Sequence, residues 1–374
     1  MGNEAIALQP DEIPKEALAL AEIVGQSDAV QRLRPALSRT AILILVAILS
    51  MICFVVETQA APVITYSFSD VDFPGADFSQ AFGLNDRGQV VGAAGPLPPP
   101  GQRLEGEFGF VFSSGQFTQF AVPNAPIGTE LFGINNSGTI VGVFGSPGQG
   151  LLLQEGSFNP IIFPGAMFTS TPGINDRGDI VGDYAFDLIG PSFSHGFILR
   201  NGQFTSIPDP PGLVNPNVHG INNRGDIVGF GYDASGAPHG FMFDGTNFTS
   251  IDVPGASQSI ALGINDRGQI VGEVVLDDGT RISGFLLDHQ AFTLIDVPGA
   301  FSTAIYGINN QGQIAGTYTD DRCLEGGCAH PHGFLATPVP ETPSLLLLIS
   351  GVISLIALPW RKRAAIVTCS SWRR

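Results

Sequence analysis

The sequence predicts an all-β protein, a six-bladed β-propeller of four-stranded blades that is closed by its N-terminal strand. A ten-residue motif, Gly-Ile/Leu-Asn-Asp/Asn-x-Gly-x-Ile/Val-Val/Ala-Gly, starts at Gly83, Gly133, Gly173, Gly220, Gly263 and Gly307. The spacings are 50, 40, 47, 43 and 44 residues, a period typical of propeller blades. Each period contains four short runs rich in Ile, Val and Phe, separated by Gly, Pro, Asn and Asp. These runs and breaks indicate strands joined by turns.

The two ends of the repeat array are offset by one strand. Residues 66–76 match the last part of a period, whereas the array stops at 332–335, which is the third strand of a period. Residues 66–73 therefore complete the sixth blade. A ring closed in this way has no exposed sheet edge between its termini. An open solenoid would have no reason for such an offset and would carry distinct caps.

Each motif contains a turn with a specific chemistry. Two apolar runs flank four residues such as Asn265-Asp266-Arg267-Gly268. Asn and Asp side chains accept hydrogen bonds from the backbone two residues on, and Gly adopts positive φ without strain. We therefore predict that the first Asn of every motif is a structural turn residue. These residues are Asn85, Asn135, Asn175, Asn222, Asn265 and Asn309.

The N-terminal part has the pattern of an export signal. Basic residues at 32–39 precede an apolar run over 41–56, and Ala60-Ala61 follow it. This order predicts a signal peptide over 32–61 that is cleaved near Ala60. A retained N-terminal anchor is the alternative. Residues 1–31 form an acidic extension, which a translation start later than Met1 would explain.

The C-terminal part has three consecutive features. Pro340-Glu341-Thr342 lies in a short linker (338–343), an apolar segment covers 344–360, and Arg361-Lys362-Arg363 follows in a basic tail (361–374). An apolar segment closed by basic residues predicts a transmembrane helix with a cytoplasmic tail. The pattern resembles the PEP-CTERM sorting signal of Gram-negative bacteria, although the third position is Thr342 rather than Pro. The resemblance implies an exosortase-like sorting protease as partner. It also implies a transient inner-membrane anchor and release to the cell surface or matrix. A plain C-terminal anchor is the alternative.

The repeat domain, predicted over 62–337, contains a second recurring signature. It reads His195-Gly196-Phe197, His239-Gly240-Phe241 and His332-Gly333-Phe334. Together with the Gly-Ile-Asn-Asp-Arg-Gly block it resembles the HAF repeat, with Gly in place of Ala. The resemblance covers about 70–337. It implies an extracellular bacterial repeat protein and no settled activity.

Composition excludes several function classes. The net charge of −17 opposes nucleic-acid binding, which needs a basic surface. The sequence has no Gly-x-Ser-x-Gly elbow, no Lys between residues 62 and 337 and no His or Cys at zinc spacing. We therefore predict no catalytic residues, metal ligands or cofactor. Two alternatives stay open. The recurring His residues could converge on a metal at the axis, and turn carboxylates such as Asp176, Asp179 and Asp183 could bind calcium.

Cys323 and Cys328 lie five residues apart in a loop of the last blade. In an exported domain this spacing, with Gly326-Gly327 between them, predicts a local disulfide.

The expected function is non-enzymatic. We expect a secreted or cell-surface protein that binds extracellular polysaccharide or protein, because motifs shared by all blades indicate structure, whereas an active site would occur once. Two other functions stay open: an extracellular carbohydrate-active enzyme (a hydrolase or lyase) with carboxylates around the central channel, and a self-associating structural protein of the envelope.

Overall fold

The computed structural model describes residues 65–97, 106–123, 125, 128–187, 194–276, 281–320 and 330–339. The chain divides into two units, Met1–Val63 and Ile64–Arg374, and all described residues belong to the second. The predicted signal peptide and C-terminal helix lie outside the described residues. So do Cys323, Cys328 and the sorting residues Pro340, Glu341, Arg361, Lys362 and Arg363. Within the described ranges no helix is long and apolar enough to cross a membrane.

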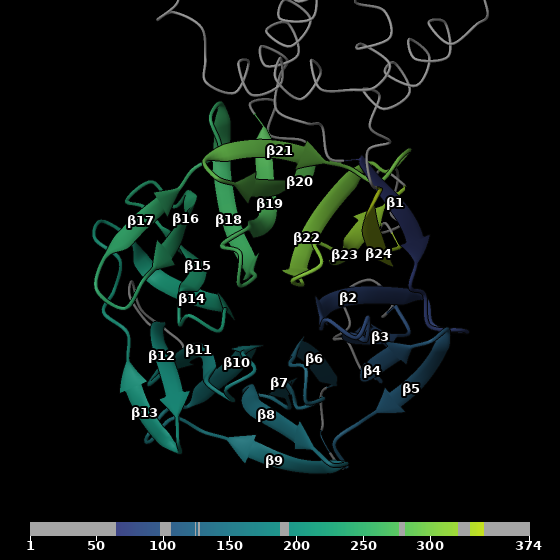
Figure 1. The fold of residues 1–374 in the computed structure, drawn as a ribbon. Helices are drawn as coiled ribbons and strands as arrows, with labels where there is room; N and C mark the ends of the chain where they lie inside the picture. Colours follow the sequence, from purple (N-terminus) through teal and green to yellow (C-terminus); the bar gives the residue numbers. More distant parts are fainter. Residues whose placement is uncertain are drawn as a thin grey trace, which may run out of the picture. The chain divides into compact units, whose positions relative to one another are not determined.

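The described residues form six four-stranded antiparallel sheets, which follow one another around a central axis (Figure 1). This confirms the predicted six-bladed propeller. The strands of blades 1 to 3 are β2 (Phe78–Leu84), β3 (Val90–Gly95), β4 (Phe108–Ser113), β5 (Gln116–Phe120), β6 (Thr129–Ile134), β7 (Ile140–Phe144), β8 (Gln149–Gln154), β9 (Ser157–Ile161), β10 (Phe168–Ile174), β11 (Ile180–Ala185), β12 (His195–Arg200) and β13 (Gln203–Ser206). The strands of blades 4 to 6 are β14 (Val214–Ile221), β15 (Ile227–Tyr232), β16 (Pro238–Phe243), β17 (Phe248–Ile251), β18 (Ala256–Ile264), β19 (Ile270–Leu276), β20 (Ile282–Asp288), β21 (Ala291–Ile295), β22 (Ser302–Ile308), β23 (Ile314–Thr319), β24 (His332–Val339) and β1 (Thr65–Asp70).

The sixth blade is built from both ends of the repeat array, as the offset predicts. β1 pairs antiparallel with β24, in a register from Thr65 opposite Val339 to Asp70 opposite Phe334. β24 continues through Val339 because β1 offers partners along its whole length. The first strand therefore supplies the outer edge of the last blade and joins the ends of the ring.

The six inner strands approach one another closely around the axis, which explains the first Gly of each motif. A Cβ on Gly263 would lie 2.7 Å from the carbonyl oxygen of Tyr306 in the next blade. The other five motif glycines face a backbone carbonyl of the next blade in the same way. Larger residues at these positions would push neighbouring blades apart.

The core lies between the blades. The Phe of the Gly-Phe pair on the third strand is buried in every blade that has it, and Leu151 takes its place in blade 2. Phe110, Phe197, Phe285 and Phe334 have no exposed surface. The repeated apolar positions thus fill the space between adjacent sheets.

The propeller has two different faces. We call the face with the six motif turns, such as Asn265–Gly268, the turn face. Each first strand runs into such a turn, so the connections between second and third strands lie at the opposite end. The blade-to-blade connections, such as Phe73–Asp77, lie there as well. We call this the loop face, and its connections differ most in length and sequence.

Candidate functional site

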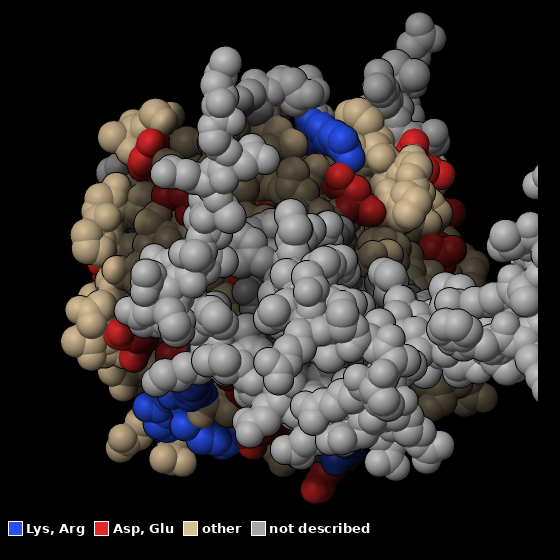
Figure 2. Space-filling view, turned by 45° about the horizontal axis from the view of Figure 1, so that its top comes forward, with Lys and Arg blue, Asp and Glu red and all other residues tan. Residues whose placement is uncertain are grey.

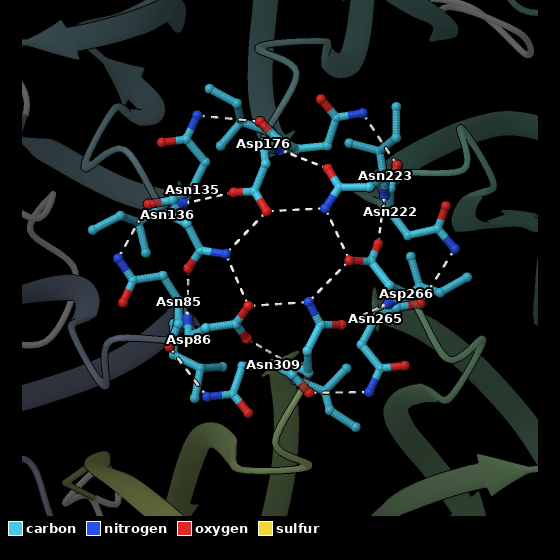
Figure 3. Close-up of a pocket in the computed structure, with 18 residues that line it drawn as sticks. Asn85, Asp86, Asn135, Asn136, Asp176, Asn222, Asn223, Asn265, Asp266 and Asn309 are labelled. Atoms are coloured by element: carbon cyan, nitrogen blue, oxygen red, sulfur yellow. Dashed lines mark hydrogen bonds between the residues drawn. The ribbon is translucent and has the colours of Figure 1, made fainter.

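The six motif turns meet at the axis on the turn face and line a cavity of about 70 Å³ (Figure 3). Each blade contributes three consecutive residues: an aliphatic residue, the predicted turn Asn, and an Asp or Asn. The aliphatic residues form the floor of the cavity, and all but Ile174 are less than 9% exposed. They are Leu84, Ile134, Ile174, Ile221, Ile264 and Ile308.

The structure places all six predicted turn Asn residues in their turns, and each is buried. Asn265 is representative: its Oδ1 accepts hydrogen bonds from the backbone N–H groups of Arg267 (3.1 Å) and Gln269 (3.0 Å). Its Nδ2 also donates to the carbonyl oxygen of Asn309 in the next blade, at 3.0 Å. Every blade repeats this bond, and Asn309 completes the circle by donating to the Asn85 carbonyl. The turn residue therefore also ties each blade to its neighbour.

The next motif residue alternates strictly between Asp and Asn around the ring (Figure 3). In chain order the six residues, which we call the axial ring, are Asp86, Asn136, Asp176, Asn223, Asp266 and Asn310. Asn223 is representative of the three amides: its Nδ2 donates to Oδ2 of Asp176 at 2.9 Å and to Oδ2 of Asp266 at 2.8 Å. Asn136 and Asn310 bridge their two Asp neighbours in the same way.

The alternation has a stoichiometric reason. An amide NH₂ group carries two hydrogens, and a carboxylate oxygen accepts two hydrogen bonds comfortably. Three amides and three carboxylates in alternation therefore satisfy one another around a closed ring. The Oδ1 atom of each ring residue accepts a hydrogen bond from a backbone N–H of the preceding blade, as Asp266 Oδ1 does from Asn223 N at 2.7 Å. Only an even number of blades can close such a pattern.

This network limits the chemistry of the turn face. Its amide hydrogens and carboxylate oxygens are engaged between blades, and its floor is aliphatic. The cavity has room for a few water molecules and is far smaller than a small-molecule pocket. In the described part of the chain no group of three or more His, Cys, Asp or Glu is arranged to hold a metal ion.

The recurring histidines do not meet at the axis. Each pairs with an Asp of its own blade on the loop face: His195 with Asp209 (3.2 Å), His239 with Asp252 (2.9 Å) and His332 with Asp72 (2.8 Å). The hydrogen bond to Asp252 raises the pKa of His239, and the carboxylates of Asp252 and Asp233 add to this effect. Each histidine thus links the third strand of its blade to the segment that follows the fourth strand.

The carboxylates considered for calcium are dispersed. Asp176 belongs to the axial ring, and Asp179 is held by Arg200 through two hydrogen bonds of 3.0 and 3.1 Å. Burial opposes ionisation of Asp179, but hydrogen bonds from Arg200 and Asn175 outweigh it and hold its pKa below the usual value. Asp183 is buried, and burial raises its pKa to about 7. Figure 2 shows Asp and Glu at several separate places on the described surface.

Our sequence analysis missed three polar residues on the inner two strands, each of which has a different residue at the same position of the other blades. Glu130 on β6, Glu273 on β19 and Tyr306 on β22 lie deep in the ring but keep some contact with solvent. Burial raises the pKa of all three, and the charges of Glu273 and Glu130 raise that of Tyr306 further. Aligning the repeats would have found them, because the other blades carry different residues at these positions.

The loop face of blade 3 exposes a group of large apolar side chains. Ile162, Met167 and Phe186 are 47%, 55% and 53% exposed. Phe186 lies edge-on to Phe163, with 6.3 Å between ring centroids, and the Phe163 ring stacks on Tyr184 with 3.6 Å between centroids and 3° between planes. We call these five residues the blade 3 patch. Exposed apolar groups of this kind mark interaction sites more often than isolated apolar residues do.

Comparisons with known proteins establish no family for this chain. No family model and no curated protein match it. Among solved structures, virginiamycin B lyase from Staphylococcus aureus is 11% identical, with 74% of this chain and 100% of that chain covered and a TM-score of 0.38. The gluconolactonase XC5397 from Xanthomonas campestris is 13% identical (76% and 96% covered, TM-score 0.43). The Aleuria aurantia lectin AAL, in complex with Fucα1-6GlcNAc, is 10% identical (71% and 99% covered, TM-score 0.43). These similarities concern the fold alone.

Proposed function

We propose that this chain is a non-enzymatic binding protein for extracellular polysaccharide and that it binds its ligand on the loop face. The two faces support this proposal differently. On the turn face the polar groups at the axis bond to one another across the blades. On the loop face the connections vary between blades and carry the exposed side chains that are not repeated.

The observation that carries the proposal is the blade 3 patch with its polar border. Phe186 exposes about half of its surface, and His195 and Asp209 form a pair beside Tyr184. The Tyr184 hydroxyl lies 3.0 Å from that of Ser206. A pyranose ring has an apolar face of C–H groups and an edge of hydroxyls. Such a ligand fits an exposed aromatic ring that is bordered by hydroxyl, imidazole and carboxylate groups.

The test is binding of the full-length chain to a panel of soluble bacterial and plant polysaccharides, measured by affinity electrophoresis. We expect Phe186→Ala to weaken binding at least tenfold. The matched control is Leu294→Ala, which removes an apolar side chain of similar exposure (46%) from β21. Failure of the wild-type chain to bind any polysaccharide would refute the proposal, and a surface protein would then be the ligand to seek.

A carbohydrate-active enzyme is the second candidate, and the neighbouring carboxyl groups of Glu107 and Glu130 favour it. Burial, with a contribution from the charge of Glu130, raises the pKa of Glu107 to about 7. A carboxyl group that holds its proton near neutral pH, beside a second carboxyl group, has the properties of an acid–base pair. Release of reducing ends from the same panel, abolished by Glu107→Gln and by Glu130→Gln, would establish this activity in place of simple binding.

We further propose that the chain is a HAF-repeat protein that is exported and sorted by an exosortase-like protease. The sequence patterns around 32–61 and 340–363 support this step. Intact mass of protein recovered from the outside of the producing cell tests it. We expect a start near Ala61 and an end near Pro340. A mass that retains residues 344–360 would show an anchored protein instead.

A further inference from the structure

Blade 1 contains a cavity of about 200 Å³ on the loop face. Its walls come from the connection that enters the blade and from the ends of its outer three strands. The lining combines two aromatic rings, two prolines, small residues, a carboxylate and an amide: Phe73, Pro74, Gly75, Ala76, Asp77, Gly95, Pro96, Phe108 and Gln119.

Comparison with blade 3 shows why blade 1 has a cavity. Tyr184 and Phe186 of blade 3 correspond to Ala94 and Pro96 of blade 1, since β11 and β3 align without a gap. Phe186 lies over Gly165, 3.6 Å from where a Cβ would stand, whereas nothing lies within 4 Å of that point on Gly75. Ala94 is fully buried and does not line the cavity, so the opening in blade 1 corresponds to the space that Phe186 fills in blade 3.

The polar partner of the missing tyrosine is present in blade 1. In blade 3 the Tyr184 hydroxyl pairs with Ser206, and in blade 6 the corresponding Tyr318 hydroxyl donates to Asp70 at 3.0 Å. The strand registers place Gln119 at the same position in blade 1. Gln119 is exposed and lines the cavity, but Ala94 offers it no hydroxyl. Blade 1 thus keeps the hydrogen-bonding group and lacks the hydroxyl-bearing ring.

The lining also indicates the charge of the ligand. The rings of Phe73 and Phe108 lie edge to face with 4.8 Å between centroids and provide an apolar wall. Asp77 is the one charged residue of the lining, and its Oδ2 accepts a hydrogen bond from the backbone N–H of Leu97 at 3.1 Å. No Arg, Lys or His is among the described residues that line the cavity. Among the described lining residues a ligand carboxylate would meet the negative charge of Asp77, and this part of the lining therefore favours an uncharged sugar over a uronic acid.

We propose that this cavity is a subsite for one uncharged pyranose ring of the polysaccharide. The ring lies over Gly75 in the place that Phe186 occupies in blade 3, packs against Phe73 and Phe108, and gives hydroxyl hydrogen bonds to the Gln119 amide oxygen and the Asp77 carboxylate. The inference rests on the proposed function for the class of ligand. The site itself is distinct from the blade 3 patch.

The test uses the full-length chain and saturation-transfer NMR with the methyl glycosides of glucose, galactose and mannose. Methyl glucuronide is the anionic counterpart. Pro96→Phe places in blade 1 the ring that Phe186 provides in blade 3, and because Pro96 is exposed and lines the cavity we expect it to abolish binding without lowering the unfolding temperature. Gln119→Ala removes only an exposed amide, and we expect it to weaken binding about tenfold. Gln116→Ala, an exposed residue on the same strand that does not line the cavity, is the matched control and should bind like wild type.

The outcomes separate the subsite from the proposed function. Binding of a neutral glycoside that both variants reduce supports the subsite. Three results overturn it: no neutral glycoside binds, methyl glucuronide binds as tightly as the neutral glycosides, or Gln119→Ala binds like wild type. If Pro96→Phe does not fold, Gln119→Ala decides. Polysaccharide binding that persists while the subsite test fails leaves the proposed function intact.

Discussion

Replacing one amide of the axial ring by a carboxylate tests the alternation most directly. Asn223→Asp replaces the side-chain NH₂ group by an oxygen atom and keeps the shape of the side chain. It removes the Nδ2 donor that bridges Asp176 and Asp266 at 2.9 and 2.8 Å. It also places three carboxylates side by side, each facing the next with no hydrogen between them.

The magnitude follows from these contacts. Two hydrogen bonds to charged acceptors at a partly exposed position contribute about 1.5 kcal/mol each. Repulsion from two flanking carboxylates at about 4 Å adds roughly 1 kcal/mol each at a water-like dielectric constant. The free energy of unfolding should therefore fall by about 5 kcal/mol at pH 7. That is a large part of the usual stability of a folded domain.

The pH dependence gives the mutation a distinct signature. Its neighbours raise the pKa of the introduced carboxyl in the folded state, so the folded chain binds a proton more tightly than the unfolded chain. Stability is then lost as the pH rises and is regained below about pH 4, where the protonated carboxyl can donate again.

The assay is urea unfolding of both chains at pH 7 and pH 4, and Asn201→Asp is the matched control. That residue lies in the exposed turn between β12 and β13 and gains the same charge outside the ring. We expect the control to change stability by less than about 0.5 kcal/mol. Wild-type stability of Asn223→Asp at pH 7, or an equal loss at both pH values, would refute the account of the ring.

Three further changes test other parts of the fold. Asp183→Asn should stabilise the chain by up to about 4 kcal/mol at pH 8 and by almost nothing at pH 4. The reason is that the buried carboxyl has a pKa of about 7, so its ionisation opposes folding as the pH rises. Urea unfolding measures the effect, and an equal difference in free energy of unfolding between mutant and wild type at both pH values would contradict it. Gly263→Ala should lower the free energy of unfolding by about 1–3 kcal/mol, because the new Cβ would lie 2.7 Å from the Tyr306 carbonyl oxygen. Thermal unfolding measures this loss, and an unchanged unfolding temperature would show that the blades can move apart freely. Phe68→Ala in the closing strand should lower the free energy of unfolding by about 3 kcal/mol, because the Phe68 ring packs edge-on against Phe334 with 5.6 Å between centroids. Pulse proteolysis measures the loss, and resistance to protease equal to wild type would show that ring closure does not depend on this contact.

Many properties of this fold are local, and they could be predicted from the sequence. The Asn of each turn bonds to backbone groups two and four residues ahead, so ten residues suffice to specify the turn. The period of the motif indicates the blade, and the offset of residues 66–73 indicates the closing strand. The turn residues were therefore identifiable one copy at a time.

The candidate sites were less accessible to sequence reasoning because they depend on comparison between blades. Asp86 and Asn310 are 224 residues apart and become neighbours only when the ring closes. The sequence shows that Asp and Asn alternate, but the motif as we wrote it treats them as equivalent. Glu130, Glu273 and Tyr306 were missed for the same reason, since the repeats had not been aligned position by position.

By itself, the sequence determined that this chain folds as a closed ring of six similar blades, because turn chemistry and hydrophobic alternation act over a few residues. The tertiary structure alone decided which side chains complete one another. The amide hydrogens of one blade meet carboxylate oxygens of the next only in the folded ring, and the cavity beside Phe73 is open where Phe186 covers the corresponding glycine of another blade. Both features depend on the packing of residues that are distant in the chain, which no local pattern specifies.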